Sequence, residues 1–198
     1  MDRYRFPFDE DRIPFDGIYV LFEKGELAHG GDRIVRVGTH TGENQLRSRL
    51  RQHFIAENKD RSIFRKNVGR CLLNRDNDPF LKDWELDLTA REAKEKHALA
   101  IDHGKQALVE KRVTEYIRDS FSFVVFGVKE KEKRLGLESK IISTVSLCDD
   151  CMPSERWLGR SSPKEKIRDS GLWLVNELYK EPFSETEMQG LTDILGIR

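Results

Sequence analysis

Arginine, histidine and glutamate side chains occur in this sequence at positions where a helix would normally bury apolar ones. Arg49 and His53 share a stripe at helical spacing with three apolar residues, Leu46, Leu50 and Phe54. Glu138 shares a similar stripe with Leu135, Ile142 and Val145. Burying unpaired charges costs several kcal/mol, so such residues usually have a use. An arginine can grip phosphate, a carboxylate can hold a metal ion and an imidazole can move a proton.

Strands and helices have to bring these groups together. The helices are those that carry Arg49 and Glu138, and the strands are expected at residues 17–23, 33–39 and 121–128. Residues 24–32 have glycines near both ends and favour a hairpin longer than the tightest turns. Three strands with helices between them predict an α+β fold, in which a small three-stranded antiparallel sheet is flanked by helices.

The motifs and their order resemble those of the GIY-YIG nuclease superfamily. Its pattern is a GIY strand, a YIG strand, a helix with Arg-x-x-x-His and a later helix with a lone glutamate. The matching residues here are Gly17-Ile18-Tyr19, Arg36-Val37-Gly38, Arg49 with His53, and Glu138.

The resemblance covers residues 17–54 and 121–146. It departs from the family pattern at Arg36, which stands where the family has its second tyrosine. Residues 55–120 are a helical insertion and residues 147–198 a C-terminal extension. We therefore expect residues 1–198 to form a single GIY-YIG-like nuclease domain, whose compact fold is the α+β fold predicted above.

The resemblance also implies a division of roles in phosphodiester hydrolysis. Tyr19 would be the general base that takes a proton from water, and His53 would hold that phenol or relay the proton. Arg49 would bind a phosphate oxygen. Glu138 would hold a divalent cation, Mg²⁺ or Mn²⁺, which proteins often bind through only one or two carboxylates.

Three further residues are candidates for substrate binding. Arg36 would face the phosphate and favour the ionised form of Tyr19, although it cannot accept a proton at neutral pH. His40, two residues beyond Gly38, could stand in as a polar group. Asn176 is the only asparagine after Glu138, and it could complete the site or merely decorate a helix.

Each candidate also has an ordinary structural interpretation. A strand tyrosine such as Tyr19 is usually a core residue with its hydroxyl at the rim. Arg49 could reach the surface, with Glu138 as its simple ion-pair partner. His53 could be a hydrogen-bonded core histidine. The family order of the whole set favours the functional interpretation.

Local patterns outline the rest of the chain. Residues 1–16 are expected to be an irregular lead-in. Helices are expected at 62–73, where Ser62 is the N-cap, at 89–103 and at 107–119. Residues 147–183 are predicted to be mostly irregular, with Trp157 and Trp173 docking this segment onto the core. Ser184 and Glu187 form a capping box for a last helix.

The composition excludes little. The chain has 35 basic and 35 acidic residues, so its zero net charge gives no global support for nucleic-acid binding. Residues 47–70 are locally basic, which suits phosphate contacts or a solvated helix face equally well. No apolar run is long enough for a membrane span and no signal peptide is visible, so a cytoplasmic protein is the default expectation.

The three cysteines do not suggest a disulfide framework. Cys148 and Cys151 have the Cys-x-x-Cys spacing of half a zinc site, and a histidine could complete it. Structural zinc needs four ligands, however, and Cys71 has no partner at matching spacing. Free thiols on a loop are therefore the expectation.

The sequence thus predicts a metal-dependent endonuclease that acts on DNA, with a protein partner or a homodimer as open possibilities. Restriction, repair and mobile-element roles also stay open. The alternative is a catalytically silent nucleic-acid-binding module that kept the fold after losing the second tyrosine. An ordinary interaction domain with buried ion pairs would show neither binding nor cleavage.

Overall fold

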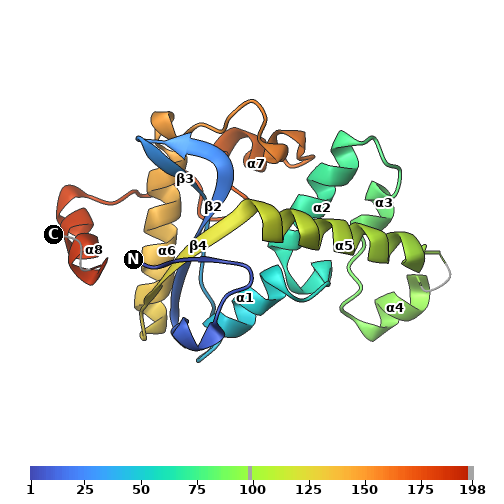
Figure 1. The fold of residues 1–198 in the computed structure, drawn as a ribbon, viewed down its shortest axis with the longest axis horizontal. Helices are drawn as coiled ribbons and strands as arrows, with labels where there is room; N and C mark the ends of the chain where they lie inside the picture. Colours follow the sequence, from blue (N-terminus) through green and yellow to red (C-terminus); the bar gives the residue numbers. More distant parts are fainter. Residues whose placement is uncertain (98–99, 196–198) are drawn as a thin grey trace.

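The chain folds around a four-stranded antiparallel sheet in the order β1-β4-β2-β3. The computed structural model describes residues 1–97 and 100–195 (Figure 1). The strands are β1 (Arg3–Arg5), β2 (Gly17–Ala28), β3 (Gly31–Gly38) and β4 (Phe121–Gly127). The predicted α+β class and flanking helices are confirmed. The sheet has four strands rather than three, because part of the expected irregular lead-in forms β1 and pairs with β4.

The strands of the β2–β3 hairpin are longer than expected, and the turn between them is tighter. Ala28 pairs with Gly31, so only His29 and Gly30 form the turn, and both have positive φ angles, 52° and 74°. The expectation of a long loop at 24–32 is wrong, because β2 continues to Ala28 and the charged side chain of Glu26 is buried. Arg33 and Glu26 form a buried ion pair at 2.7 Å, with side chains 0% and 5% exposed. Internal pairing lets these charged residues occupy a strand.

Each face of the sheet is covered by its own set of helices. Tyr19 and Leu21 point into a core with α1 (Leu46–Phe54), α2 (Ile63–Arg75) and α5 (His103–Ser120). Ile18 and Val20, which alternate with them along β2, point into a second core with α6 (Lys131–Ser146). Figure 1 shows α6 on one side of the sheet and the insertion helices on the other. This alternation decides which side chains reach the site.

The insertion packs into the same core as the sheet, and its helix α2 begins at the predicted N-cap. Ser62 accepts a hydrogen bond from the backbone N–H of Arg65. After α2 come α3 (Leu81–Trp84), α4 (Arg91–His97) and α5. The expected helix at 89–103 is therefore shorter than predicted.

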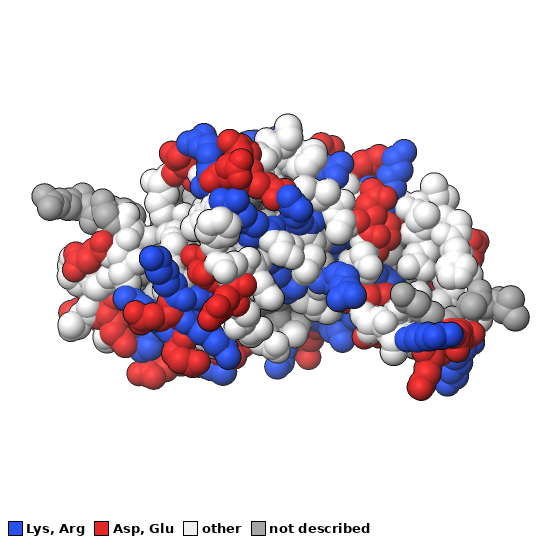
Figure 2. All heavy atoms as spheres, turned by 90° about the horizontal axis from the view of Figure 1, so that it is seen from below, with Lys and Arg blue, Asp and Glu red and all other residues white. Residues whose placement is uncertain are grey.

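The basic stretch at 47–70 is largely internal. Lys59, Arg65, Lys66 and Arg70 are all buried, so the solvated-face interpretation is wrong for these four residues. Arg65 pairs with Glu110 at 2.8 Å and Arg70 with Glu85 at 2.5 Å. On the surface, Figure 2 shows acidic and basic side chains interspersed over the lower face. Charge therefore marks no broad phosphate-binding face in this view.

The C-terminal extension is anchored by one buried carboxylate. Glu23 accepts hydrogen bonds from the indole N–H groups of Trp157 and Trp173, at 2.8 and 2.7 Å. The backbone N–H of Trp173 also donates to the carbonyl of Val35 in β3. The two tryptophans thus dock this segment as predicted. Its helices are α7 (Glu165–Ser170) and α8 (Glu185–Leu195).

The predicted capping box opens α8. Glu187 accepts from the backbone N–H of Ser184, and the Ser184 hydroxyl accepts from the N–H of Glu187. A search of the helices within the described ranges found none with the length and apolar character needed to cross a membrane.

Candidate active site

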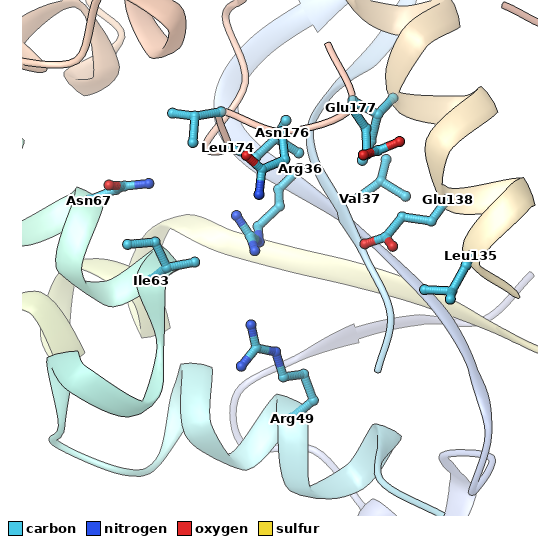
Figure 3. Close-up of a pocket in the computed structure, with 12 residues that line it drawn as sticks. Arg36, Val37, Arg49, Ile63, Asn67, Leu135, Glu138, Leu174, Asn176 and Glu177 are labelled. Carbon is cyan, nitrogen blue, oxygen red and sulfur yellow. The ribbon is translucent and has the colours of Figure 1, made fainter. Parts of the chain in front are cut away.

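A pocket of about 460 Å³ opens where β3, α1, α2, α6 and the C-terminal extension meet. Figure 3 shows the side chains of Arg36, Arg49 and Glu138 converging on it from three different elements. Segment 174–177 forms a further wall. The other lining residues are Val37, Ile63, Asn67, Leu135, Ile142, Leu174, Val175, Asn176 and Glu177.

Tyr19 and His53 form a hydrogen-bonded pair behind this pocket. The Tyr19 hydroxyl lies 2.8 Å from Nε2 of His53, and both side chains are fully buried. On the other side of the ring, Nδ1 of His53 lies 2.8 Å from the hydroxyl of Ser62. When Nδ1 donates its hydrogen to Ser62, Nε2 is left as an acceptor for the phenol.

The surroundings of His53 keep its ring neutral. Burial lowers the pKa of His53 well below its ordinary value of 6.5, and the nearby charges of Arg36, Arg49 and Arg65 lower it further. A neutral imidazole retains the lone pair that can accept a proton. His53 is therefore a hydrogen-bonded core histidine whose neutral ring can accept a hydrogen bond from the Tyr19 phenol.

Arg36 links the buried tyrosine to the pocket. Its Nε donates to the Tyr19 hydroxyl at 3.3 Å, and its Nη1 donates to the carbonyl oxygen of Trp173. The guanidinium also lies over the ring of Phe64, 5.4 Å from the centroid. Of the two residues bonded to the Tyr19 hydroxyl, only Arg36 lines the pocket.

Glu138 points into the pocket from α6. One carboxylate oxygen accepts a hydrogen bond from the backbone N–H of Thr39 at 3.1 Å. Burial raises the pKa of Glu138, while the charge of Arg36 and the Thr39 hydrogen bond oppose that rise. Within the described ranges, no ion pair of 4 Å or less joins Glu138 to an arginine. Glu138 is thus not a simple partner of Arg49.

Arg49 and Arg51 are placed differently on α1. Arg49 is half-buried and lines the pocket, with Nη1 donating to the side chain of Gln52 at 3.0 Å and to the carbonyl of Arg61 at 3.3 Å. Arg51 is exposed and pairs with Glu10 at 2.6 Å. Only the first arginine can meet a ligand in the pocket.

Of the two remaining candidates, Asn176 lines the pocket and His40 does not. His40 is buried outside the lining; one ring nitrogen accepts from the N–H of Gly17 at 3.3 Å, and the other bonds to the carbonyl of Gly42 at 2.8 Å. It braces the backbone, and its predicted contact with substrate gains no support. Asn176 lines the pocket, on an irregular segment rather than a helix.

Two polar residues that line the pocket, Asn67 and Glu177, were not anticipated from the sequence. Asn67 of α2 is buried and accepts from Arg70 at 2.5 Å. Glu177 has a φ of 63° and its carboxylate is bonded to Lys180 and Ser139. A non-glycine residue at positive φ is uncommon, so the backbone conformation of Glu177 marks it as unusual. The sequence itself does not show this conformation.

Comparison with known protein families agrees with this arrangement. A model of the GIY-YIG domain matches residues 7–195, which is nearly the whole chain. The chain belongs to the GIY-YIG domain family. No curated protein and no solved structure gives a significant match. Membership supports a nuclease-type function, and GIY-YIG nucleases generally depend on a divalent metal.

The two motif glycines of this GIY-YIG chain have a steric explanation. A Cβ at Gly17 would lie 2.2 Å from the carbonyl oxygen of Phe126 in β4. A Cβ at Gly38, which pairs with Tyr19 across the strands, would lie 2.2 Å from the Tyr19 hydroxyl. Both distances are impossible for a real side chain, so each glycine is required by a close approach rather than by backbone freedom.

Proposed function

We propose that this GIY-YIG protein is a metal-dependent endonuclease that hydrolyses phosphodiester bonds in DNA. The observation that carries the proposal is the convergence of Arg36, Arg49 and Glu138 on one pocket. Two guanidinium groups offer forks for phosphate oxygens, and one carboxylate offers a hard oxygen ligand. The pocket therefore offers positive charge for an anionic substrate and a carboxylate for a metal ion.

Glu138 is the residue that would hold Mg²⁺ or Mn²⁺. One of its oxygens is oriented by Thr39, so the carboxylate has a fixed direction before any metal binds. A bound divalent cation would polarise the phosphate and stabilise the leaving oxygen. The positive charge would also favour the ionised form of Glu138, whose pKa burial raises.

Tyr19 would serve as the general base, with its phenol held in place by His53. The 2.8 Å contact to neutral His53 fixes the direction of the hydroxyl. In this arrangement the Tyr19 side chain has no exposed surface. Arg36 therefore has to turn from the hydroxyl toward the phosphate before water can reach the phenol. Phosphate binding supplies the opposite charge that would draw it there.

The test is cleavage of supercoiled plasmid DNA by the purified protein with Mg²⁺ or Mn²⁺, and with chelator. We expect nicked or linear DNA only with metal. Glu138→Gln should lose cleavage but keep DNA binding in a mobility-shift assay, since glutamine is nearly isosteric and one carboxylate carries most of the metal affinity. The exposed Glu132→Gln is the matched control on the same helix, and it should cleave like the parent. If Glu138→Gln cleaves at the parent rate, Glu138 is not the metal ligand.

The burial of Tyr19 behind Arg36 favours one alternative, a catalytically silent nucleic-acid-binding module. In that case the plasmid stays intact with every metal, while a mobility shift still occurs and is weakened by Arg49→Ala. A protein partner or a second copy of the chain could then bring the missing activity. Cleavage by the parent but not by Tyr19→Phe would exclude this alternative.

A further inference from the structure

A second cluster of metal-ligating side chains lies outside the pocket. His29 at the tip of the β2–β3 hairpin meets Cys148 and Cys151, which follow the C-terminal end of α6. One nitrogen, Nε2 of His29, lies 3.2 Å from Sγ of Cys148 and 3.3 Å from Sγ of Cys151. All three ligand atoms lie within 4.8 Å of one another. We propose that His29, Cys148 and Cys151 bind a zinc ion.

The spacing of the three atoms suits a tetrahedral centre. Zn–S and Zn–N bonds of about 2.3 and 2.0 Å at a tetrahedral angle place sulfur and nitrogen about 3.5 Å apart. The observed separations of 3.2 and 3.3 Å need only a small expansion to admit the ion. On binding, the two thiols release their protons and the imidazole binds as the neutral base.

The local backbone favours this convergence. The N–H of Cys151 donates to the carbonyl of Cys148 at 3.1 Å, and this short turn presents both sulfurs on one side. His29 holds a positive φ of 52°, which few side chains adopt. That conformation is part of the two-residue turn that ends the hairpin next to the cysteines.

The ligand chemistry separates this site from the pocket. Two thiolates and an imidazole are ligands for zinc, whereas Mg²⁺ prefers oxygen atoms such as those of Glu138. The side chain of His29 is exposed, so water can take the fourth position. The ion would join the tip of the hairpin to the segment after α6. This cross-link is the role proposed for the ion, and it stands independently of the nuclease proposal.

The direct test is the zinc content of the full-length protein, purified without a polyhistidine tag and under reducing conditions. After loading with ZnSO₄ and dialysis, elemental analysis should find one zinc ion per chain. Replacement of zinc by Co²⁺ should give the thiolate-to-cobalt absorption of a tetrahedral site. Cys148→Ser, Cys151→Ser and His29→Asn should each weaken zinc affinity more than about a hundredfold, since loss of even an outer partner costs up to that much.

Two matched controls keep the test decisive. Asparagine tolerates positive φ, so His29→Asn removes the ligand and keeps the turn. Cys71 is buried in the main core, so Cys71→Ala removes a thiol without touching the cluster and should keep the zinc. Zinc should raise the melting temperature of the parent and of Cys71→Ala only. Parent protein without zinc, a Cys148–Cys151 disulfide under these conditions, or equal zinc content in all variants would overturn the proposal.

Discussion

The hydroxyl of Tyr19 and Nε2 of His53 lie 2.8 Å apart in a fully buried pair. Both side chains are fully buried, so the protonation of His53 is coupled to folding. The electrostatic surroundings of His53 therefore give a prediction that is independent of any substrate.

We expect His53 to make the protein less stable as the pH falls below 6.5. The pKa of His53 is well below 6.5 in the folded chain, because of burial and of Arg36, Arg49 and Arg65. Between 6.5 and that lowered value, the unfolded chain binds a proton that the folded chain does not, so unfolding is favoured as pH falls. Urea midpoints should therefore drop less across this range for His53→Gln than for the parent. Parallel pH profiles for the two proteins would contradict the assignment.

Arg49→Ala should reduce cleavage far more than Arg51→Ala, although both residues lie on α1. Arg49 lines the pocket, whereas Arg51 is exposed and paired with Glu10. Loss of a contact to the transition-state phosphate should cost on the order of 3 kcal/mol, or about a hundredfold in rate. Loss of an exposed ion pair should cost at most about 1 kcal/mol of stability. If Arg49→Ala and Arg51→Ala have equally small effects on the single-turnover rate of cleavage, Arg49 does not bind the phosphate.

Arg36→Tyr restores the family pattern and tests why this chain departs from it. The variant loses the guanidinium whose Nε donates to the Tyr19 hydroxyl at 3.3 Å, and with it one of the two phosphate forks in the pocket. We expect weaker cleavage, and none in the Tyr19→Phe control. A rise in activity would mark Arg36 as a defect. Rescue of an inactive parent would establish the silent-module alternative.

Gly38→Ala should destabilise the fold and impair cleavage together. The new Cβ would lie 2.2 Å from the hydroxyl of Tyr19 and 2.4 Å from its Cζ, so the ring has to shift. Overpacking of this kind typically costs about 1–3 kcal/mol. Gly136→Ala is the control on α6, where nothing lies within 4 Å and alanine should stabilise the helix by about 0.5–1 kcal/mol. Chemical denaturation would compare both variants, and an unchanged midpoint for Gly38→Ala would refute the steric argument.

The elements with strong local signals could be predicted from the sequence. The apolar run of β4, the stripe of α1, and the caps at Ser62 and Ser184 all depend on neighbours within a few residues, and each was found where expected. The motif order also led us to expect Arg36, Arg49 and Glu138 close together, and all three line one pocket, while their roles stay predictions.

Features that depend on distant partners were not predicted. The extension of β2 beyond residue 23 places Glu26 in a strand, where it needs the buried ion pair with Arg33; a charged residue considered alone indicates a loop. Asn67 lies on a helix whose face toward the pocket has no distinctive pattern, and Glu177 lies in an irregular segment. His29 meets its cysteines across more than a hundred residues of sequence. Such contacts become visible only after the chain has folded.

The docking of segment 171–177 onto β3 has a consequence for the order in which the protein becomes functional during its synthesis. Tyr19, Arg49 and Glu138 all leave the ribosome before Trp173, whose carbonyl holds Arg36, and before the pocket wall at 174–177. A nascent chain therefore carries the motif residues before it can assemble the pocket around them. The pocket can be complete only after residue 177 has been made.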